Sequence, residues 1–207
     1  MKRKFALLLV LVAALAGAVT AWITIERPGT RPALEQATLL EVARPLPQFE
    51  LLDQAGRAFL RDKLRGQWTL MFFGFTNCPD VCPTTLATLA EVRRQLADLP
   101  AGELPVVAFV SVDPARDTPE ALGRYVANFD PQFLGVTGQP VALEVLTHHL
   151  GVAVAIGPAS EDGNYTVDHT AAIFLIDPSA AFMAVFGSPH AADVIARDYR
   201  SIIATRN

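Results

Sequence analysis

Two cysteines stand close together in the run Cys78-Pro79-Asp80-Val81-Cys82-Pro83, and the chain has no others. The apolar run Leu70–Phe75 before them is typical of a buried strand. The segment from Pro83 to Leu99 repeats apolar residues every three or four positions, which indicates one face of a helix. Both thiols are therefore expected at a strand-to-helix junction, where the helix dipole favours thiolate. Such a pair can bind a soft metal ion or exchange disulfides.

The prolines around the pair restrict its backbone. A proline steers the residue before it away from the α region, so we expect Cys78 and Cys82 in extended or turn geometry. Pro83 suits the first position of a helix, where no N–H is needed. The helix is therefore expected to begin at Pro83.

A structural disulfide is one interpretation of the pair, since cysteines in oxidising compartments are usually joined. The loop that it would close is short, and chain entropy predicts only about 2 kcal/mol of stabilisation. A chain of 207 residues can bury a sufficient core without it. We therefore favour a chemical role, either redox or metal binding, and keep the structural disulfide as an alternative.

The N-terminus predicts a membrane anchor. Basic residues at positions 2–4 precede an uncharged apolar stretch, Phe5–Ile25, which as a helix would span about 32 Å, enough for the core of a bilayer. The basic residues stay cytoplasmic, so the rest of the chain is expected outside. A cleaved signal peptide is the alternative, because Val19-Thr20-Ala21 resembles a cleavage site. We expect residues 1–25 to be an uncleaved, single-pass anchor in a bacterial inner membrane, with the domain facing the periplasm.

Residues 26–44 are interpreted as a tether, because several prolines and Gly29 break up regular structure. Within it, residues 34–42 could form a short helix. Residues 45–207 are expected to form one folded domain. The formal net charge is −4 and no basic patch alternates with aromatic residues, which argues against nucleic-acid binding.

Apolar strands alternate with helices through this domain. Strands are expected at residues 49–51, 58–60, 68–75, 106–112, 134–136, 152–156, 171–177 and 182–186, and helices at residues 83–99, 119–129, 140–150 and 189–203, with Thr118 capping the second helix. Strands that are apolar on both faces imply a central sheet with helices on both sides. A βαβ unit, a closing β-hairpin and a last helix, with cysteines after the first core strand, point by analogy to an α/β thioredoxin-like fold with a central mixed sheet.

A histidine stands close to where this fold would face the cysteines. His169 immediately precedes the core strand expected at Ala171–Asp177. Isolated histidines are more often surface residues, but two thiolates and one imidazole form a soft set that suits copper in either oxidation state. Zinc usually takes a fourth ligand, which Asp168 could supply. The hypothesis is a metal site of Cys78, Cys82 and His169.

The remaining polar candidates have simpler interpretations. His148 and His149 lie near the end of a helix, where they favour its dipole. His190, at the start of the last helix, is expected to be solvated. Asp80 is interpreted as a turn residue, with support of a metal ligand as the alternative.

Three sequence blocks resemble the Sco/SenC family. They are Phe73–Pro83 around the cysteines, Ser111–Pro119 after the next strand, and Val167–Thr170 with the strand that follows. The likeness runs from about Pro45 to the C-terminus, and an anchor with a short tether is also the family's layout. Asn77 departs from the pattern, since many members carry another residue such as His or Tyr there.

The resemblance implies a membrane-anchored copper chaperone that assembles the binuclear copper site of cytochrome c oxidase subunit II. The family's copper ligands carry over to Cys78, Cys82 and His169, with copper as Cu(I) or Cu(II). No catalytic residue is implied, so the protein is not expected to be an enzyme in the usual sense. Other periplasmic copper carriers or thiol reductants are expected as further partners.

The resemblance also leaves an alternative function open. Some members act as thiol reductants of the target's cysteine pair, so the alternative is a thiol–disulfide oxidoreductase. A peroxidase of the same fold is disfavoured, because that chemistry needs one activated cysteine with a threonine and an arginine around the peroxide. The turn from Asp113 to Pro119 is expected at the cysteine end of the sheet, and we assign it to shaping a docking surface, with a simple turn and helix cap as the alternative.

Overall fold

One mixed sheet organises the described residues of the computed structural model, which are 33–160 and 165–206. Its strands are β1 (Ala37–Pro45), β2 (Glu50–Asp53), β3 (Ala58–Leu60), β4 (Thr69–Gly74), β5 (Val106–Ser111), β6 (Leu134–Thr137), β9 (Ile173–Ile176) and β10 (Ala181–Phe186). They are ordered β1-β10-β9-β4-β5-β6-β2-β3. β4, β5 and β6 run parallel, and the other pairings in this sheet are antiparallel. A separate antiparallel ribbon joins β7 (Val154–Ile156) to β8 (Val167–His169).

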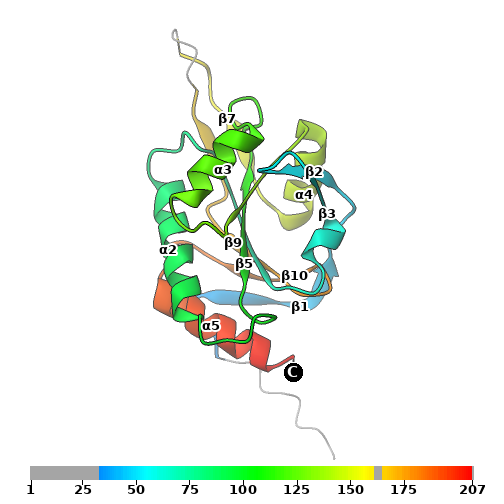
Figure 1. The fold of residues 1–207 in the computed structure, drawn as a ribbon, viewed down its shortest axis with the longest axis vertical. Coiled ribbons are helices and arrows are strands. Elements are labelled where there is room, and N and C mark those ends of the chain that lie inside the picture. Colours follow the sequence, from blue (N-terminus) through cyan, green and yellow to red (C-terminus); the bar gives the residue numbers. More distant parts are fainter. Residues whose placement is uncertain (1–32, 161–164, 207) are drawn as a thin grey trace, which may run out of the picture. The chain divides into compact units, whose positions relative to one another are not determined.

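Helices cover both faces of this sheet (Figure 1). They are the 3-10 helix η1 (Arg61–Leu64) and the α-helices α2 (Val81–Gln95), α3 (Pro119–Ala127), α4 (Pro140–Leu150) and α5 (Ala192–Ala204). In Figure 1, α2, α3 and α5 lie on one side of the strands and α4 on the other. Both faces of the central strands are therefore removed from water.

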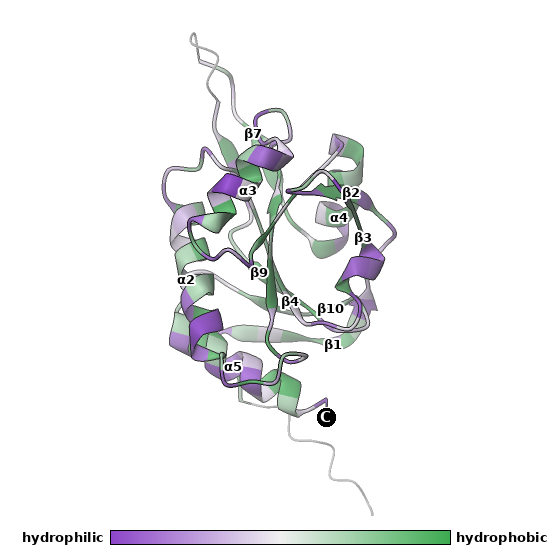
Figure 2. Ribbon diagram, viewed as in Figure 1, coloured by the Kyte–Doolittle hydropathy of each residue, from purple (hydrophilic) through white to green (hydrophobic). Residues whose placement is uncertain are grey.

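The sequence of β4 explains its central place. All of Thr69–Gly74 is buried, between β5 on one side and β9 on the other. A strand that is apolar on both faces is stable only where both faces are covered. Figure 2 shows hydrophobic colour along the central strands and a mixture of hydrophilic and hydrophobic colour along the helices.

Local signals fixed several boundaries as predicted. α4 begins at Pro140 and ends at Leu150, where Gly151 adopts the left-handed conformation with φ of 75°. The N-cap of α3 is Thr118, whose hydroxyl oxygen accepts a hydrogen bond from the N–H of Ala121 at 3.2 Å. Both features are standard devices for ending or starting a helix.

A strand replaces the short helix expected over residues 34–42. Ala37–Pro45, most of which falls in the range interpreted as a tether, forms β1 and pairs with β10. The start of β1 is held by Asp198 of α5, whose buried carboxylate accepts the backbone N–H groups of Glu35, Gln36 and Ala37 at 2.8–3.1 Å. These partners lie far along the chain, so no local pattern indicated the strand.

The predicted membrane anchor, residues 1–25, lies outside the described residues and stays a prediction. Within the ranges that the structure describes, no helix combines the length and the apolar character needed to cross a membrane. The chain from Leu34 to Arg206 forms one compact unit.

Candidate metal centre

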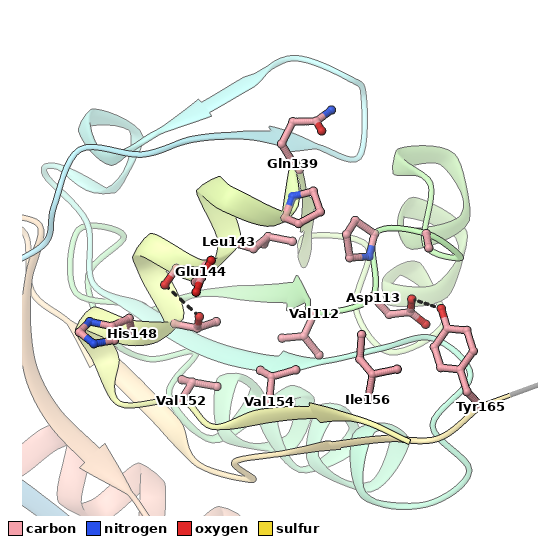
Figure 3. Close-up of a pocket in the computed structure, with 15 residues that line it drawn as sticks. Val112, Asp113, Gln139, Leu143, Glu144, His148, Val152, Val154, Ile156 and Tyr165 are labelled. Atoms are coloured by element: carbon pink, nitrogen blue, oxygen red, sulfur yellow. Dashed lines mark hydrogen bonds between the residues drawn. The ribbon is translucent and has the colours of Figure 1, made fainter. Parts of the chain in front are cut away.

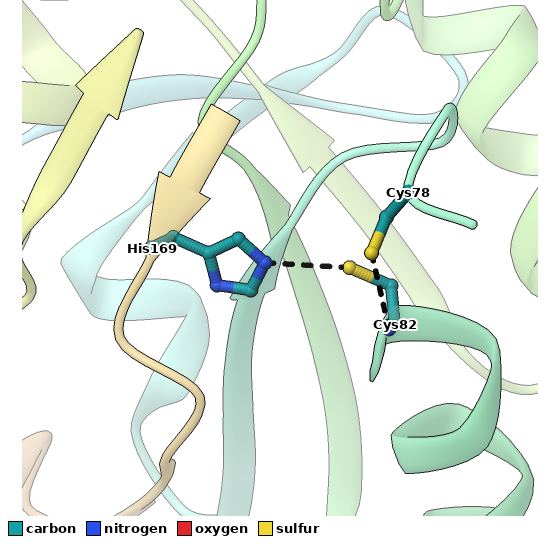
Figure 4. Close-up of side chains that lie close together, drawn as sticks. All are labelled: Cys78, Cys82 and His169. Carbon is teal, nitrogen blue, oxygen red and sulfur yellow. Dashed lines mark hydrogen bonds between the residues drawn. The ribbon is translucent and has the colours of Figure 1, made fainter. Parts of the chain in front are cut away.

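Three side chains from separate elements meet in the folded unit. Cys78 lies in the loop after β4, Cys82 is the second residue of α2, and His169 ends β8 (Figure 4). Their ligand atoms all lie within 4.8 Å of one another. Nε2 of His169 is 3.5 Å from Sγ of Cys82, and the N–H of Cys82 donates to Sγ of Cys78 at 3.4 Å. The structure therefore brings together the three residues predicted as metal ligands.

Gly74, the last residue of β4, makes room for the sulfur of Cys82. A Cβ atom at this position would lie 2.6 Å from Sγ of Cys82 and 2.7 Å from Cε2 of Phe109. Both distances are far shorter than van der Waals contact, so any larger residue would displace one of these groups. The glycine in Phe73-Gly74-Phe75 thus has a packing role beside the centre.

The imidazole of His169 is oriented by a carbonyl oxygen and two aromatic rings. Nδ1 lies 3.3 Å from the carbonyl oxygen of Thr170, so this nitrogen carries the proton when it donates there. Phe72 and Phe75 meet the ring edge-on, with ring centroids 6.0 Å and 6.1 Å away. The lone pair of Nε2 is then left facing Cys82, which is the arrangement that a metal ligand needs.

Burial outweighs the helix dipole at Cys82. The side chain is fully buried, and this raises the pKa of its thiol far above the usual value. The stabilised thiolate expected from the helix N-terminus is therefore wrong for this residue. Burial likewise lowers the pKa of His169. Both groups are neutral at neutral pH, and a bound cation would supply the charge that stabilises the thiolate.

The cysteine loop departs from its expected geometry at one residue. Cys78 ends a turn, as predicted, because its N–H donates to the carbonyl oxygen of Phe75 at 3.2 Å. Cys82 is helical instead of extended, because α2 begins at Val81 with Asp80 as its N-cap. Pro83 is the third residue of α2 and is tolerated within its first turn, since the first N–H groups of a helix have no internal acceptor to lose.

The other polar candidates lie apart from this group. Asp168 is exposed and is not part of the group, because neighbouring residues in a strand face opposite sides. His148 and His149 occupy the last turn of α4, as predicted. His190 is half-buried, not solvated, and its Nδ1 lies 3.4 Å from the hydroxyl of Thr85.

Two buried aspartates support the loop after β5, and sequence reasoning missed their roles. Asp113 accepts hydrogen bonds from the phenol of Tyr165 at 2.7 Å and from Arg116. Asp117 accepts from the backbone N–H of Thr76 at 3.0 Å. The two side chains are 2% and 1% exposed, so they hold the shape of this turn from inside the fold, and its role in shaping a docking surface stays a prediction. The only available signal was their place in the block Ser111–Pro119.

A hollow of about 690 Å³ lies beside the ribbon, between α4, β7 and the loop after β5 (Figure 3). Its lining is mostly apolar and includes Val154 and Ile156, while Glu144 and His148 are among its polar members. None of the three candidate ligands lines it. Val154 is paired with His169 across the ribbon, so the hollow and the candidate centre share this element.

Comparison with known proteins agrees with the sequence blocks. The profile of the SCO1/SenC family matches residues 38–204. The human protein "Protein SCO2 homolog, mitochondrial" is 40% identical over 193 residues, which cover 91% of this chain and 72% of that protein. The resemblance predicted from the sequence is therefore confirmed.

Solved structures share the fold. ScoI of Bradyrhizobium japonicum with copper bound is 37% identical with a TM-score of 0.67, over 75% of this chain and 98% of that one. Yeast Sco1 with copper bound is 29% identical with a TM-score of 0.72, over 78% of this chain and 90% of that one. The predicted α/β architecture around a central mixed sheet is confirmed by these likenesses.

Proposed function

We propose, since this chain belongs to the SCO1/SenC family, that it is a copper-binding protein of cytochrome c oxidase assembly. The observation that carries the proposal is the convergence of Cys78, Cys82 and His169 within 4.8 Å. Two thiolates and one imidazole are soft ligands that suit copper, and two solved relatives hold copper. Copper is the cargo of this site.

The finer proposal is delivery of this copper to the binuclear copper site of oxidase subunit II. Cys82 is fully buried, whereas Cys78 and His169 are partly exposed. An incoming thiolate therefore reaches the copper from the side of Cys78 and His169 and displaces Cys82 last. Each exchange replaces one copper–ligand bond by another, so the ion is transferred without entering water and without changing its oxidation state.

The proposed location follows from the N-terminal sequence. Residues 1–25 would anchor the chain in a bacterial inner membrane and leave the folded unit in the periplasm. Subunit II of the oxidase is the proposed partner there, with other copper carriers or thiol reductants as further partners. No turnover chemistry is proposed for the delivery itself.

Copper titration of the full-length chain tests the proposal. The reduced protein, in mild detergent and without oxygen, is expected to bind one Cu(I) per chain in competition with a chromophoric chelator. Cys78→Ser, Cys82→Ser and His169→Ala are each expected to lose this copper. His148→Ala is the matched control, because it removes an exposed imidazole from outside the centre. Undiminished copper binding in any of the three ligand variants would contradict the three-ligand site.

A thiol–disulfide oxidoreductase is the alternative, and the geometry of the thiols favours it as the second candidate. Cys78 is partly exposed, so a partner can reach its sulfur, and the N–H of Cys82 donates to this sulfur at 3.4 Å, which places the two cysteines side by side. Oxidation of this pair to a disulfide would pass two electrons and two protons to a partner disulfide, which becomes two thiols. His169→Ala should keep this activity, while either cysteine variant should abolish it. If the wild-type chain reduces a partner disulfide but binds no Cu(I), the reductase function replaces the proposed copper chaperone function.

A further inference from the structure

We infer that Asp117 is a positioning residue of the proposed copper centre and that it holds Cys78 in place through Thr76. The inference rests on the proposed function, because it concerns the geometry and affinity of the same centre. Asp117 lies in the loop between β5 and α3 and is not among the three grouped ligands. Its effect on the metal is therefore indirect.

The carboxylate of Asp117 joins the ends of two neighbouring strands. It accepts hydrogen bonds from the backbone N–H of Thr76 at 3.0 Å, from the hydroxyl of Thr76, and from the hydroxyl of Ser111 at 2.6 Å. Ser111 ends β5, and Thr76 follows the end of β4. The side chain is 1% exposed, and a buried carboxylate is tolerated only where such donors surround it.

The held residue lies inside the turn that places Cys78. This turn runs from Phe75 to Cys78 and is closed by the N–H of Cys78, which donates to the carbonyl oxygen of Phe75 at 3.2 Å. Thr76 is its second residue, and both its N–H and its hydroxyl are bonded to Asp117. Fixing Thr76 therefore fixes the direction in which the chain reaches Cys78.

Cys78 is the ligand that most needs this support. Cys82 belongs to α2, and His169 belongs to β8 with a further contact from Nδ1 to the carbonyl oxygen of Thr170. Cys78 lies in a loop, outside any helix or strand. Partners that orient metal ligands typically change metal affinity by about 10–100-fold when they are removed. We expect an effect of that size at Asp117.

Asp198 offers a matched comparison for the experiment. It is also a buried carboxylate, 2% exposed, and it also accepts backbone N–H groups, in its case from residues 35–37. Those contacts join α5 to the start of β1, and its described hydrogen bonds involve none of the three ligands. Replacing either aspartate by asparagine puts an N–H₂ group among hydrogen-bond donors, so both changes are expected to lower stability.

The experiment compares Asp117→Asn and Asp198→Asn in the full-length chain. Urea unfolding of the copper-free proteins measures stability, and chelator competition measures Cu(I) affinity. The thiolate-to-copper charge-transfer band of the Cu(II) form reports the geometry of the sulfur ligands. Both variants are expected to unfold at lower urea, but only Asp117→Asn is expected to bind Cu(I) about 10–100-fold more weakly and to shift the band.

Milder variants keep the test decisive if Asp117→Asn fails to fold. Thr76→Val removes one hydroxyl donor and keeps the carboxylate, so a smaller loss of affinity in the same direction is expected. Thr76→Ser retains the donor and is expected to match wild type.

The outcomes separate the inference from the proposed function. No copper binding by the wild type would overturn both. The positioning role alone is overturned if the wild type binds copper and Asp117→Asn keeps the same Cu(I) affinity and the same charge-transfer band. If Asp117→Asn does not fold, the same result in Thr76→Val overturns it. An equal loss of Cu(I) affinity in Asp117→Asn and Asp198→Asn also overturns the positioning role, since the loss of affinity would then result from lower stability of the fold.

Discussion

Gly74→Ala tests whether packing at the end of β4 sets the position of the Cys82 sulfur. The added methyl carbon would lie 2.6 Å from Sγ, and ordinary contact begins near 3.4 Å, so the two atoms must separate by about 0.8 Å. The ring of Phe109, 2.7 Å from the same methyl, is fully buried, so the methyl cannot relax toward it. Overpacking of this kind costs about 1–3 kcal/mol of unfolding free energy.

The same displacement predicts a loss of copper. Binding constellations tolerate shifts of about 0.5 Å, and the sulfur must move further than that. We therefore expect Cu(I) affinity to fall at least about tenfold, which corresponds to about 1.4 kcal/mol. Competition with a chelator measures the affinity, and urea unfolding of the copper-free protein measures the stability.

Two other glycines provide controls for this variant. A methyl at Gly135 would lie 2.9 Å from Cβ of Leu122, so Gly135→Ala overpacks the contact between α3 and β6. A methyl at Gly102 meets nothing within 4 Å, so Gly102→Ala is expected to be neutral. Gly135→Ala should lose stability and keep its copper affinity. If Gly74→Ala binds Cu(I) as tightly as Gly135→Ala, the packing argument is refuted.

Two further predictions concern the scaffold. Thr118→Ala removes the acceptor for the N–H of Ala121 and is expected to lower the unfolding free energy by about 0.5–2 kcal/mol; urea unfolding measures this, and Thr118→Ser should stay near wild type. Burial lowers the pKa of His190 below its ordinary 6.5, so the unfolded state takes up the proton more readily. The contribution of His190 to the unfolding free energy is therefore fully present above about pH 6.5. It is lost as the pH falls through the lowered pKa of the folded state. The fall in urea midpoint between about pH 7.5 and pH 5.5 should be smaller in His190→Gln, and a fall as large as that of wild type would contradict the assignment.

The features that could be predicted from the sequence are encoded locally. The apolar run of β4 has no polar side to expose, so it had to lie at the centre of the sheet. α4 is bounded by Pro140 and Gly151, each of which acts on its own turn. Cys78 and Cys82 stood out because they are close in the sequence. His169 was identified from its place before a core strand, together with the resemblance of its block.

The features that escaped prediction depend on residues far apart in the chain. β1 resembled a tether because its partner β10 and its anchor Asp198 lie near the other end of the protein. The raised pKa of Cys82 reflects how deeply the folded core buries one sulfur, which the helix dipole alone does not indicate. Asp117 looked like a turn residue because Thr76, its partner, is 41 positions earlier.

The separation of the proposed ligands along the chain has a consequence during protein synthesis. Cys82 and His169 are 87 residues apart. A ribosome adds about 5–20 residues per second, so the imidazole follows the thiols after roughly 4–17 s. Until β8 has emerged and paired with β7, the growing chain offers sulfur ligands without their nitrogen partner. Copper loading at this centre therefore requires synthesis to have passed His169, and a shorter nascent chain offers the two thiols alone.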